Sequence, residues 1–245
     1  MSGHSKWATI RRKKGALDAK RGKLFTKLIK EITIAARDGG SDPNGNPRLR
    51  LAVDNAKAAN MPADNIDRAI KKATGELEGV NYVEITYEGY GPAGVAILAE
   101  VVTDNKNRAV AEVRHIFSKC GGSMAESGSV AWMFERKGVI TIPKEDKTED
   151  EIMEIIVDAG ADDLRTEGDY FEVYTAVESF EPVRRTVVDK KIKTENASIQ
   201  WIAKNMINVT GEDAEKVMKL IEMLEDNDDV QNVYSNADID ESMLS

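Results

Sequence analysis

The chain has 245 residues and a formal net charge of −9, and its 41% hydrophobic content is sufficient for a sizeable core. Because the chain is longer than a typical domain of about 150 residues, we expect more than one compact unit. Its single cysteine, Cys120, excludes an internal disulfide, and it has no run of about 18 apolar residues that could span a bilayer. These properties predict a cytoplasmic protein without membrane contact.

The charge is divided unevenly along the chain. Residues 1–72 carry 17 basic and 7 acidic side chains, whereas residues 73–245 carry 17 basic and 36 acidic ones. A cationic segment ahead of an acidic body is typical of proteins that bind an external polyanion, because the acidic part repels phosphate and leaves the contact to the basic part. An organelle transit peptide is the alternative interpretation of the basic start.

The first 78 residues are predicted to form a basic helical domain. Between Asp18 and Arg37, apolar side chains recur on one side of a helix and lysines occupy the other side. The stretch 39–47 is rich in glycine, proline and asparagine and predicts a turn. We expect two shorter helices after it, the second with Pro62 in its first turn.

From Val80 onward, the pattern changes to the alternation of apolar and polar residues that is typical of strands. We expect a hairpin of strands 83–87 and 95–102, followed by a helix over 105–119 and a strand over 130–134. These elements begin a second, α+β domain.

The glycines at 89, 91 and 94 match the spacing of a dinucleotide-binding motif. That motif requires a helix immediately after the glycines, because the N-terminus of the helix binds the pyrophosphate. A strand follows here instead, so a hairpin turn is favoured over a nucleotide site. The small-residue loop from Ser123 to Ser129 is interpreted as a connection between a helix and a strand, although such loops often lie at functional edges.

Residues 137–202 are predicted to form a third, inserted domain. Their order is strand, helix, strand, strand, helix, strand, which is the split βαβ arrangement of ferredoxin-like folds. The next segment supplies a helix and two strands that complete the second domain, and the polar tail from Ser235 is expected to fray. The predicted fold class is therefore α+β with three domains: a helical domain at 1–78, an α+β domain at 79–136 plus 203–238, and the inserted ferredoxin-like domain.

Residue types that carry catalysis are sparse. The chain has only two histidines, His4 and His115, and one cysteine, and none has plausible catalytic partners nearby in sequence. Paired acidic residues such as those at 162–163 and 228–229 are typical of solvated loops and helix ends. We therefore expect no enzymatic activity, no metal, no cofactor and no small-molecule substrate.

The basic domain is the candidate nucleic-acid site. Cations flank Trp7, which suits phosphate contact combined with base stacking, although the ring could equally anchor a core. No motif for base readout is evident in the sequence. Further cations that extend the positive surface are Arg48, Arg50, Lys57, Arg68, Lys71 and Lys72. The candidate nucleic-acid-binding residues are Lys6, Trp7, Arg11, Arg12, Lys13, Lys14, Lys20, Arg21, Lys23, Lys27 and Lys30.

Several long motifs resemble the YebC/PmpR family, which also includes the mitochondrial translational activator of cytochrome c oxidase subunit I. They follow one another in the expected order over nearly the whole chain. The motifs are GHSKW at 3–7, DAKRGKLFTKLIKEI at 18–32, NPRLRL at 46–51, NMPADNIDRAIKK at 60–72, YEGYGPAGV at 87–95, TDNKNR at 103–108 and GSVAWMF at 128–134.

The resemblance implies a three-domain α+β protein without enzymatic activity. Members are described as DNA-binding transcriptional regulators, and others as ribosome-associated translation factors that bind ribosomal RNA and relieve stalling at proline-rich stretches. Phosphate attraction does not distinguish DNA from RNA, so both interpretations stay open here. A protein-interaction adaptor and a metal-dependent hydrolase that uses acidic residues are the alternatives from other functional classes.

Overall fold

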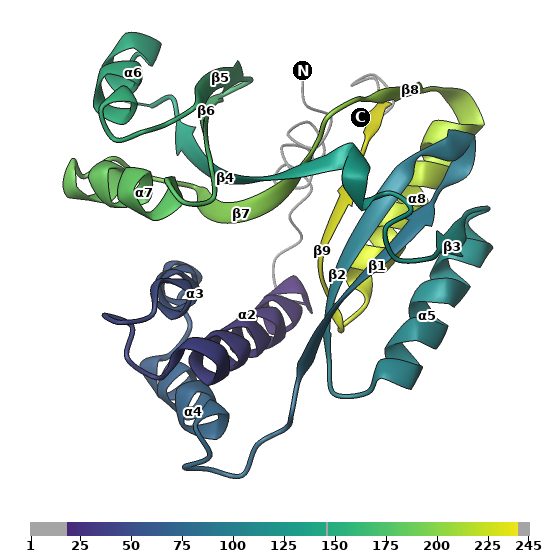
Figure 1. Cartoon of the computed structure of the whole chain (residues 1–245), viewed down its shortest axis with the longest axis horizontal. Helices are drawn as coiled ribbons and strands as arrows, with labels where there is room; N and C mark the ends of the chain where they lie inside the picture. The colour runs from purple at the N-terminus through teal and green to yellow at the C-terminus, as the bar shows by residue number, and fades with distance from the viewer. Residues whose placement is uncertain (1–18, 146, 240–245) are drawn as a thin grey trace. The chain divides into compact units, whose positions relative to one another are not determined.

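The computed structural model describes residues 19–145 and 147–239. The described residues form two compact units (Figure 1). The first unit contains the described chain up to Met133 and from Asn205 onward, and the second unit is Phe134–Lys204. The fold is α+β, with an N-terminal helical region followed by sheet-containing parts, which confirms the predicted fold class. The domain boundaries derived from the sequence stay a prediction.

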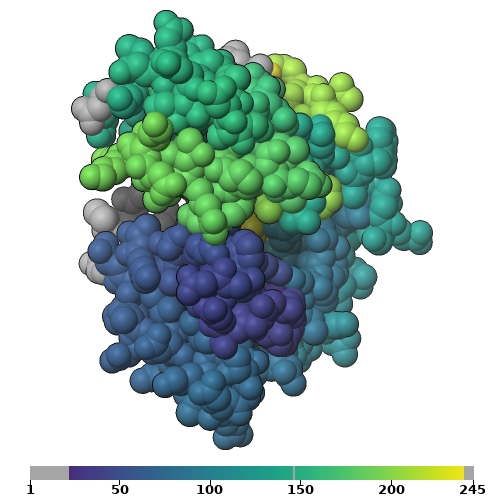
Figure 2. All heavy atoms as spheres, turned by 60° about the vertical axis from the view of Figure 1, so that its left-hand side comes forward, coloured from purple at the N-terminus to yellow at the C-terminus, as the bar shows by residue number. Residues whose placement is uncertain are grey.

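Among the described residues, three helices form the helical region, and Figure 2 shows them in purple and blue as a closely packed part of the surface. Ile32, Leu49 and Ile66 are almost fully buried in their shared core. The side chain of Asn46 joins two of the helices, because its carbonyl accepts from the Leu49 N–H at 3.1 Å and its amide donates to Ala35 O at 2.7 Å. The helices are α2 (Ala19–Gly39), α3 (Pro47–Ala58) and α4 (Ala63–Ala73); Pro62 lies just before α4 as its N-cap residue.

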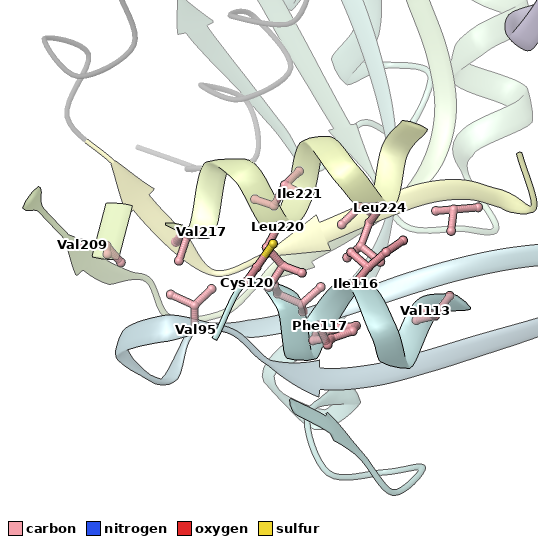
Figure 3. Packing of buried hydrophobic residues seen from close by; sticks show 14 of the residues in the cluster. Val95, Val113, Ile116, Phe117, Cys120, Val209, Val217, Leu220, Ile221 and Leu224 are labelled. Atoms are coloured by element: carbon pink, nitrogen blue, oxygen red, sulfur yellow. The ribbon is translucent and has the colours of Figure 1, made fainter. Parts of the chain in front are cut away.

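The first unit also contains an antiparallel sheet of order β3-β1-β2-β9. Two helices pack on one face of this sheet, and Figure 3 shows their apolar side chains, including Phe117 and Leu220, converging on the core. The strands are β1 (Val83–Tyr90), β2 (Ala96–Thr103), β3 (Ser123–Ala125) and β9 (Val230–Ser235), and the helices are α5 (Lys106–Lys119) and α8 (Gly211–Asp226).

The glycine-rich stretch is a hairpin turn between β1 and β2, as its context predicts. The two strands pair from Val83 with Thr103 to Tyr90 with Ala96, and the 3₁₀ turn η1 (Pro92–Gly94) connects them. Gly94 has φ +75°, a left-handed conformation that glycine adopts without strain. No helix begins after the glycines, so the requirement of a dinucleotide motif is not met.

Two expectations about local structure are wrong. Residues 130–134 do not form one strand: Ala131–Met133 is a 3₁₀ turn, η2, and β4 begins at Phe134. The backbone N–H groups of Val130 and Ala131 donate to the Glu88 carboxylate and are therefore not available to a sheet.

The expectation that the tail frays from Ser235 onward is also wrong for the residues up to Ile239. Residues Ala237–Ile239 form β10, which pairs in parallel with β8 (Ile207–Val209). Ala237 and Ile239 are buried, which gives this short strand an apolar side despite the polar sequence around it.

The second unit has the ferredoxin-like topology predicted from the order of its elements. Its sheet has the order β5-β6-β4-β7, and all neighbouring strands are antiparallel. A capping box of Thr148 and Glu151 begins the first of its two helices. The elements are β4 (Phe134–Pro143), α6 (Glu149–Val157), β5 (Asp163–Glu167), β6 (Tyr170–Thr175), α7 (Phe180–Asp189) and β7 (Asn196–Ala203).

We predict that Gly89→Ala destabilises the first unit by about 1–3 kcal/mol, because added volume in a packed core forces neighbours to shift. A Cβ at this position would lie 2.5 Å from a ring carbon of Phe117 and 2.7 Å from the carbonyl oxygen of Ser123. Urea denaturation followed by circular dichroism measures the effect. Gly22→Ala is the control: apart from its chain neighbours and the backbone of its own helix, no heavy atom lies within 4 Å of its added Cβ, and alanine favours the helix by about 1 kcal/mol. Equal stability of the two variants would contradict the packing argument.

Candidate nucleic-acid interface

The N-terminal arm, which carries most of the candidate residues, lies outside the described part of the chain. Lys20 and Arg21 belong to α2, but the positions of their side chains are likewise not described. For the arm residues as well as for Lys20 and Arg21, contact with nucleic acid therefore stays a prediction. The arm residues concerned are Lys6, Trp7, Arg11, Arg12, Lys13 and Lys14.

The three described lysines of α2 among the candidates all reach the chain at the end of α8. Lys23 Nζ donates to Asp226 O at 2.9 Å, and Lys27 Nζ donates to Glu225 O at 2.9 Å. Lys30 Nζ donates to Asp228 O at 2.8 Å and to Val102 O at 3.0 Å. The spacing of four and three residues places these lysines on one side of α2.

Two properties of the C-terminal end of α8 explain why this end attracts cations from another helix. The last carbonyl groups of a helix have no partners within the helix, and the helix dipole adds a partial negative charge there. The last turn of α8 contains no basic residue of its own, and acidic residues surround it at Glu225, Asp226, Asp228 and Asp229. The lysines of α2 supply the missing donors and the missing positive charge.

Lys30 also forms a buried ion pair. Its Nζ lies 2.7 Å from Asp229 Oδ1, and the two side chains are only 6% and 7% exposed. The other Asp229 oxygen accepts from Thr103 Oγ1 at 2.9 Å and from Arg108 Nη2 at 2.8 Å. Burial disfavours the charge of Asp229, but the hydrogen bonds from Lys30, Arg108 and Thr103 outweigh it and hold the pKa of the carboxyl below its ordinary value.

These contacts correct the interpretation of α2 as a helix with a solvent-facing row of lysines. Lys30 is buried and is not accessible to an external phosphate, Lys27 is half-buried, and Lys23 is exposed. All three ammonium groups hold carbonyl oxygens of the same protein. The sequence signal for this role is the run of acidic residues at 225–229, which follows a helix that lacks a basic last turn.

Three arginines of the helical region also have structural partners. Arg37 donates to Tyr82 O, and Arg50 Nε donates to Pro43 O at 2.9 Å. Arg48 forms ion pairs with Glu31 and with Glu84 of β1. Burial opposes the charge of Arg48, but the hydrogen bonds to both carboxylates outweigh it and raise the pKa of the guanidinium. These three cations therefore hold turns and neighbouring elements together.

The cations of α4 are different. Arg68, Lys71 and Lys72 are exposed, and none forms an ion pair with another residue of the described ranges. Their spacing of three and four residues places them on one side of the helix, whereas Ile66 and Ala69 face the core. We call Arg68, Lys71 and Lys72 the α4 cations. Lys71 and Lys72 lie in the last turn of α4, where their charge also interacts favourably with the helix dipole. They can still bind a phosphate while they do so.

Among the described residues, the groups considered for catalysis have other roles or lie exposed on the surface. Asp162 pairs with Lys137 at 2.9 Å, Asp229 belongs to the buried network, and His115 is exposed on α5. Within residues 19–145 and 147–239, no group of three histidine, cysteine, aspartate or glutamate side chains is placed to hold a metal ion. No helix in the same ranges has both the length and the apolar character needed to cross a membrane.

The fold and these contacts define the class: an α+β protein in which a basic helical region precedes a four-stranded sheet and a ferredoxin-like unit. The family model described as the TACO1/YebC protein N-terminal domain matches residues 5–76, and the model of the TACO1/YebC second and third domain matches residues 82–237. The chain belongs to the TACO1/YebC family.

Similar proteins align with all or nearly all of the chain. A probable transcriptional regulatory protein from Desulfatibacillum aliphaticivorans is 59% identical over 244 residues, which are 100% of this chain and 99% of the relative. One from Geobacter sulfurreducens is 59% identical over 98% of this chain and 96% of the relative. The crystal structure of a conserved hypothetical protein from Aquifex aeolicus matches with a TM-score of 0.87 and 45% identity, covering 93% of this chain and 94% of that chain.

We predict that Lys30→Met lowers the free energy of unfolding by about 3–5 kcal/mol, because it leaves the buried Asp229 carboxylate without its main cation. Urea denaturation measures the loss. Lys23→Met is the matched control: Lys23 contacts the same helix end, but its side chain is 45% exposed, so we expect a loss of about 0–1 kcal/mol. Losses of similar size in the two variants would show that the buried pair has no special role.

The lowered pKa of Asp229 also predicts an acid-sensitive part of the stability. An aspartate whose pKa is lower in the folded state stabilises the fold fully above its ordinary pKa of about 3.9, and this contribution is lost as the pH falls through the folded-state pKa. Denaturation midpoints recorded from neutral to acidic pH should therefore fall more steeply for the wild type than for Asp229→Asn. Parallel pH profiles would contradict the assignment.

Proposed function

We propose that this protein is a non-enzymatic, nucleic-acid-binding regulator of gene expression and that its N-terminal helical region makes the phosphate contacts. The observation that carries the proposal is the division of charge, with 17 basic and 7 acidic residues up to position 72 and 17 basic and 36 acidic residues after it. The exposed α4 cations support it from the structure, because they lie on one helix side without internal ion pairs. We propose that the cations of the N-terminal arm also contact phosphate.

Transcription regulation with DNA as the target is the first candidate. The relatives at 56–59% identity are named probable transcriptional regulatory proteins, and they cover nearly the same length as this chain. A phosphate-binding surface also suits DNA, since backbone contacts position a protein on the duplex and supply most non-specific affinity.

Binding to ribosomal RNA is the second candidate, and the charge distribution on α4 favours it. A recognition helix in the major groove contacts base edges with its N-terminal residues. The N-terminal half of α4 instead exposes Asp64 and Asp67, which would face phosphates unfavourably, and only its C-terminal half is cationic. This arrangement suits contact with the backbone of a shaped RNA, as expected of a ribosome-associated translation factor.

We predict that replacing Arg68, Lys71 and Lys72 together by Glu weakens nucleic-acid binding and reduces its salt dependence. The slope of log affinity against log salt should decrease by about 0.9 for each duplex phosphate contact that is lost. Fluorescence anisotropy with a labelled duplex over a salt series measures both quantities. The same experiment on Arg11, Arg12, Lys13 and Lys14 tests the arm.

The matched control reverses three exposed lysines of the second unit, Lys190, Lys191 and Lys193, which changes the net charge by the same amount. If this control loses as much affinity as the α4 variant, the effect is one of net charge and the proposed surface is wrong. Salt-insensitive binding by the wild type would contradict the proposal as a whole. Ultraviolet crosslinking in cells, followed by sequencing of the attached nucleic acid, separates the two candidates by recovering promoter DNA or ribosomal RNA.

A further inference from the structure

The lysines of α2 are bound to the end of α8 in two different ways. Lys23 Nζ lies 3.4 Å from Asp226 Oδ1, and the two side chains are 45% and 75% exposed. The pair of Lys30 and Asp229 is closer, at 2.7 Å, and almost fully buried. Water and salt screen an exposed pair, so it contributes little to stability, whereas a buried pair is costly to break. Lys23 can therefore exchange Asp226 for another anion while Lys30 keeps α2 in place.

The end of α8 also carries negative charge that the carbonyl contacts of these lysines do not require. Lys23 donates to the backbone oxygen of Asp226 at 2.9 Å. Lys30 donates to the backbone oxygen of Asp228 at 2.8 Å. The side chains of Asp226 and Asp228 are exposed, and they repel a phosphate within a Debye length of about 8 Å. The segment therefore opposes a phosphate that approaches Lys23 from outside.

Lys23 continues the cationic sequence of the N-terminal arm. The arm has five basic residues between positions 6 and 14, and Lys20 and Arg21 follow at the start of α2. With a rise of about 1.5 Å per residue, Lys20 and Lys23 lie within one turn of the helix. A phosphate polymer that is bound by the arm and the start of α2 would therefore meet Lys23 next, and with it the acidic segment 225–229.

Two simpler roles for this segment predict different behaviour. A structural clamp would need the contact of Lys23, but the buried pair of Lys30 already fixes the same part of α2. A general acidic surface would repel nucleic acid no more than any two other exposed carboxylates of the chain. The contact of Asp226 with a lysine of the proposed binding surface distinguishes it from those carboxylates.

We propose that the acidic segment 225–229 is an intramolecular competitor of nucleic acid. It binds Lys23 in the free protein and yields this lysine to a phosphate when a nucleic acid binds. The inference rests on the proposed function and adds a regulation of the same phosphate-binding surface. The ammonium group exchanges one anion for another, so the gain from a phosphate at Lys23 is only the difference between the two contacts.

The test neutralises the two exposed carboxylates with Asp226→Asn and Asp228→Asn, which keeps the backbone oxygens that bind the lysines. Fluorescence anisotropy with a labelled duplex at one fixed salt concentration should show about fivefold tighter binding than for the wild type. The control variant, Glu154→Gln with Asp158→Asn, changes the net charge equally. Both control residues are exposed, at α6 and its C-cap, and form no ion pair with another described residue. This control should change the affinity by no more than about twofold.

A double-mutant cycle tests the exchange at Lys23 itself. In the wild type, Lys23→Met removes a lysine that Asp226 already occupies, so the affinity should fall by less than about twofold. In the neutralised variant the same lysine is available to phosphate, and Lys23→Met should weaken binding about fivefold. Circular dichroism and urea denaturation verify that each variant keeps its fold. If the double replacement unfolds, the cycle is measured with Asp226→Asn alone.

Equal effects of Lys23→Met in the two backgrounds would overturn the competition and leave the proposed function intact. A gain in the neutralised variant that is no larger than the gain in the control would do the same. If the wild type does not bind nucleic acid at any salt concentration, the proposed function fails, and this inference fails with it.

Discussion

The buried pair of Lys30 and Asp229 is the interaction on which the arrangement of the first unit depends. One carboxylate receives hydrogen bonds from α2 through Lys30, from β2 through Thr103 and from α5 through Arg108, at the turn between α8 and β9. Three elements, α2, β2 and α5, therefore meet at a single charge in a turn that lies more than 100 residues further along the chain. A buried ion pair often adds little net stability compared with apolar side chains of similar size, but breaking it is costly. A shift of α2 would break the bonds of Lys30 to Asp229, Asp228 O and Val102 O together.

This constraint changes the meaning of the sequence charge. The lysines of α2 contribute to the strong positive balance of the first 72 residues, yet those at 23, 27 and 30 neutralise the end of α8 within the same protein. The acidic segment 225–229 receives these lysines, so it binds α2 and does not act only as a surface that repels phosphate. Net charge by segment thus overstated the cationic surface that faces outward, and the nucleic-acid partner that it indicated stays a prediction. Within the described residues of the helical region, the α4 cations and Lys57 of α3 are exposed and form no ion pair with another described residue.

The elements that were predicted well are those whose signal is local. The periodicity of α2, the alternation in β1 and the element order of the ferredoxin-like unit depend on neighbouring residues, so the sequence reveals them directly. The predictions that were wrong concern residues whose bonding partners lie far away in the sequence. Lys30 binds an aspartate 199 residues away, and Glu88 takes the amide of Val130 across 42 residues and so prevents the expected strand. Apolar pattern alone does not distinguish a strand from a loop whose amides are bonded to a remote side chain.

Glu88 and Asp229 are buried carboxylates that are stabilised in the same way. Each is a carboxylate kept charged in a buried place by three donors, and each fixes a segment whose own sequence would leave it undetermined. The consequences differ because of what the fixed segment carries. Asp229 binds the ammonium group of Lys30 inside the protein, which removes a cation from the surface, whereas Glu88 fixes the backbone of the loop between β3 and β4.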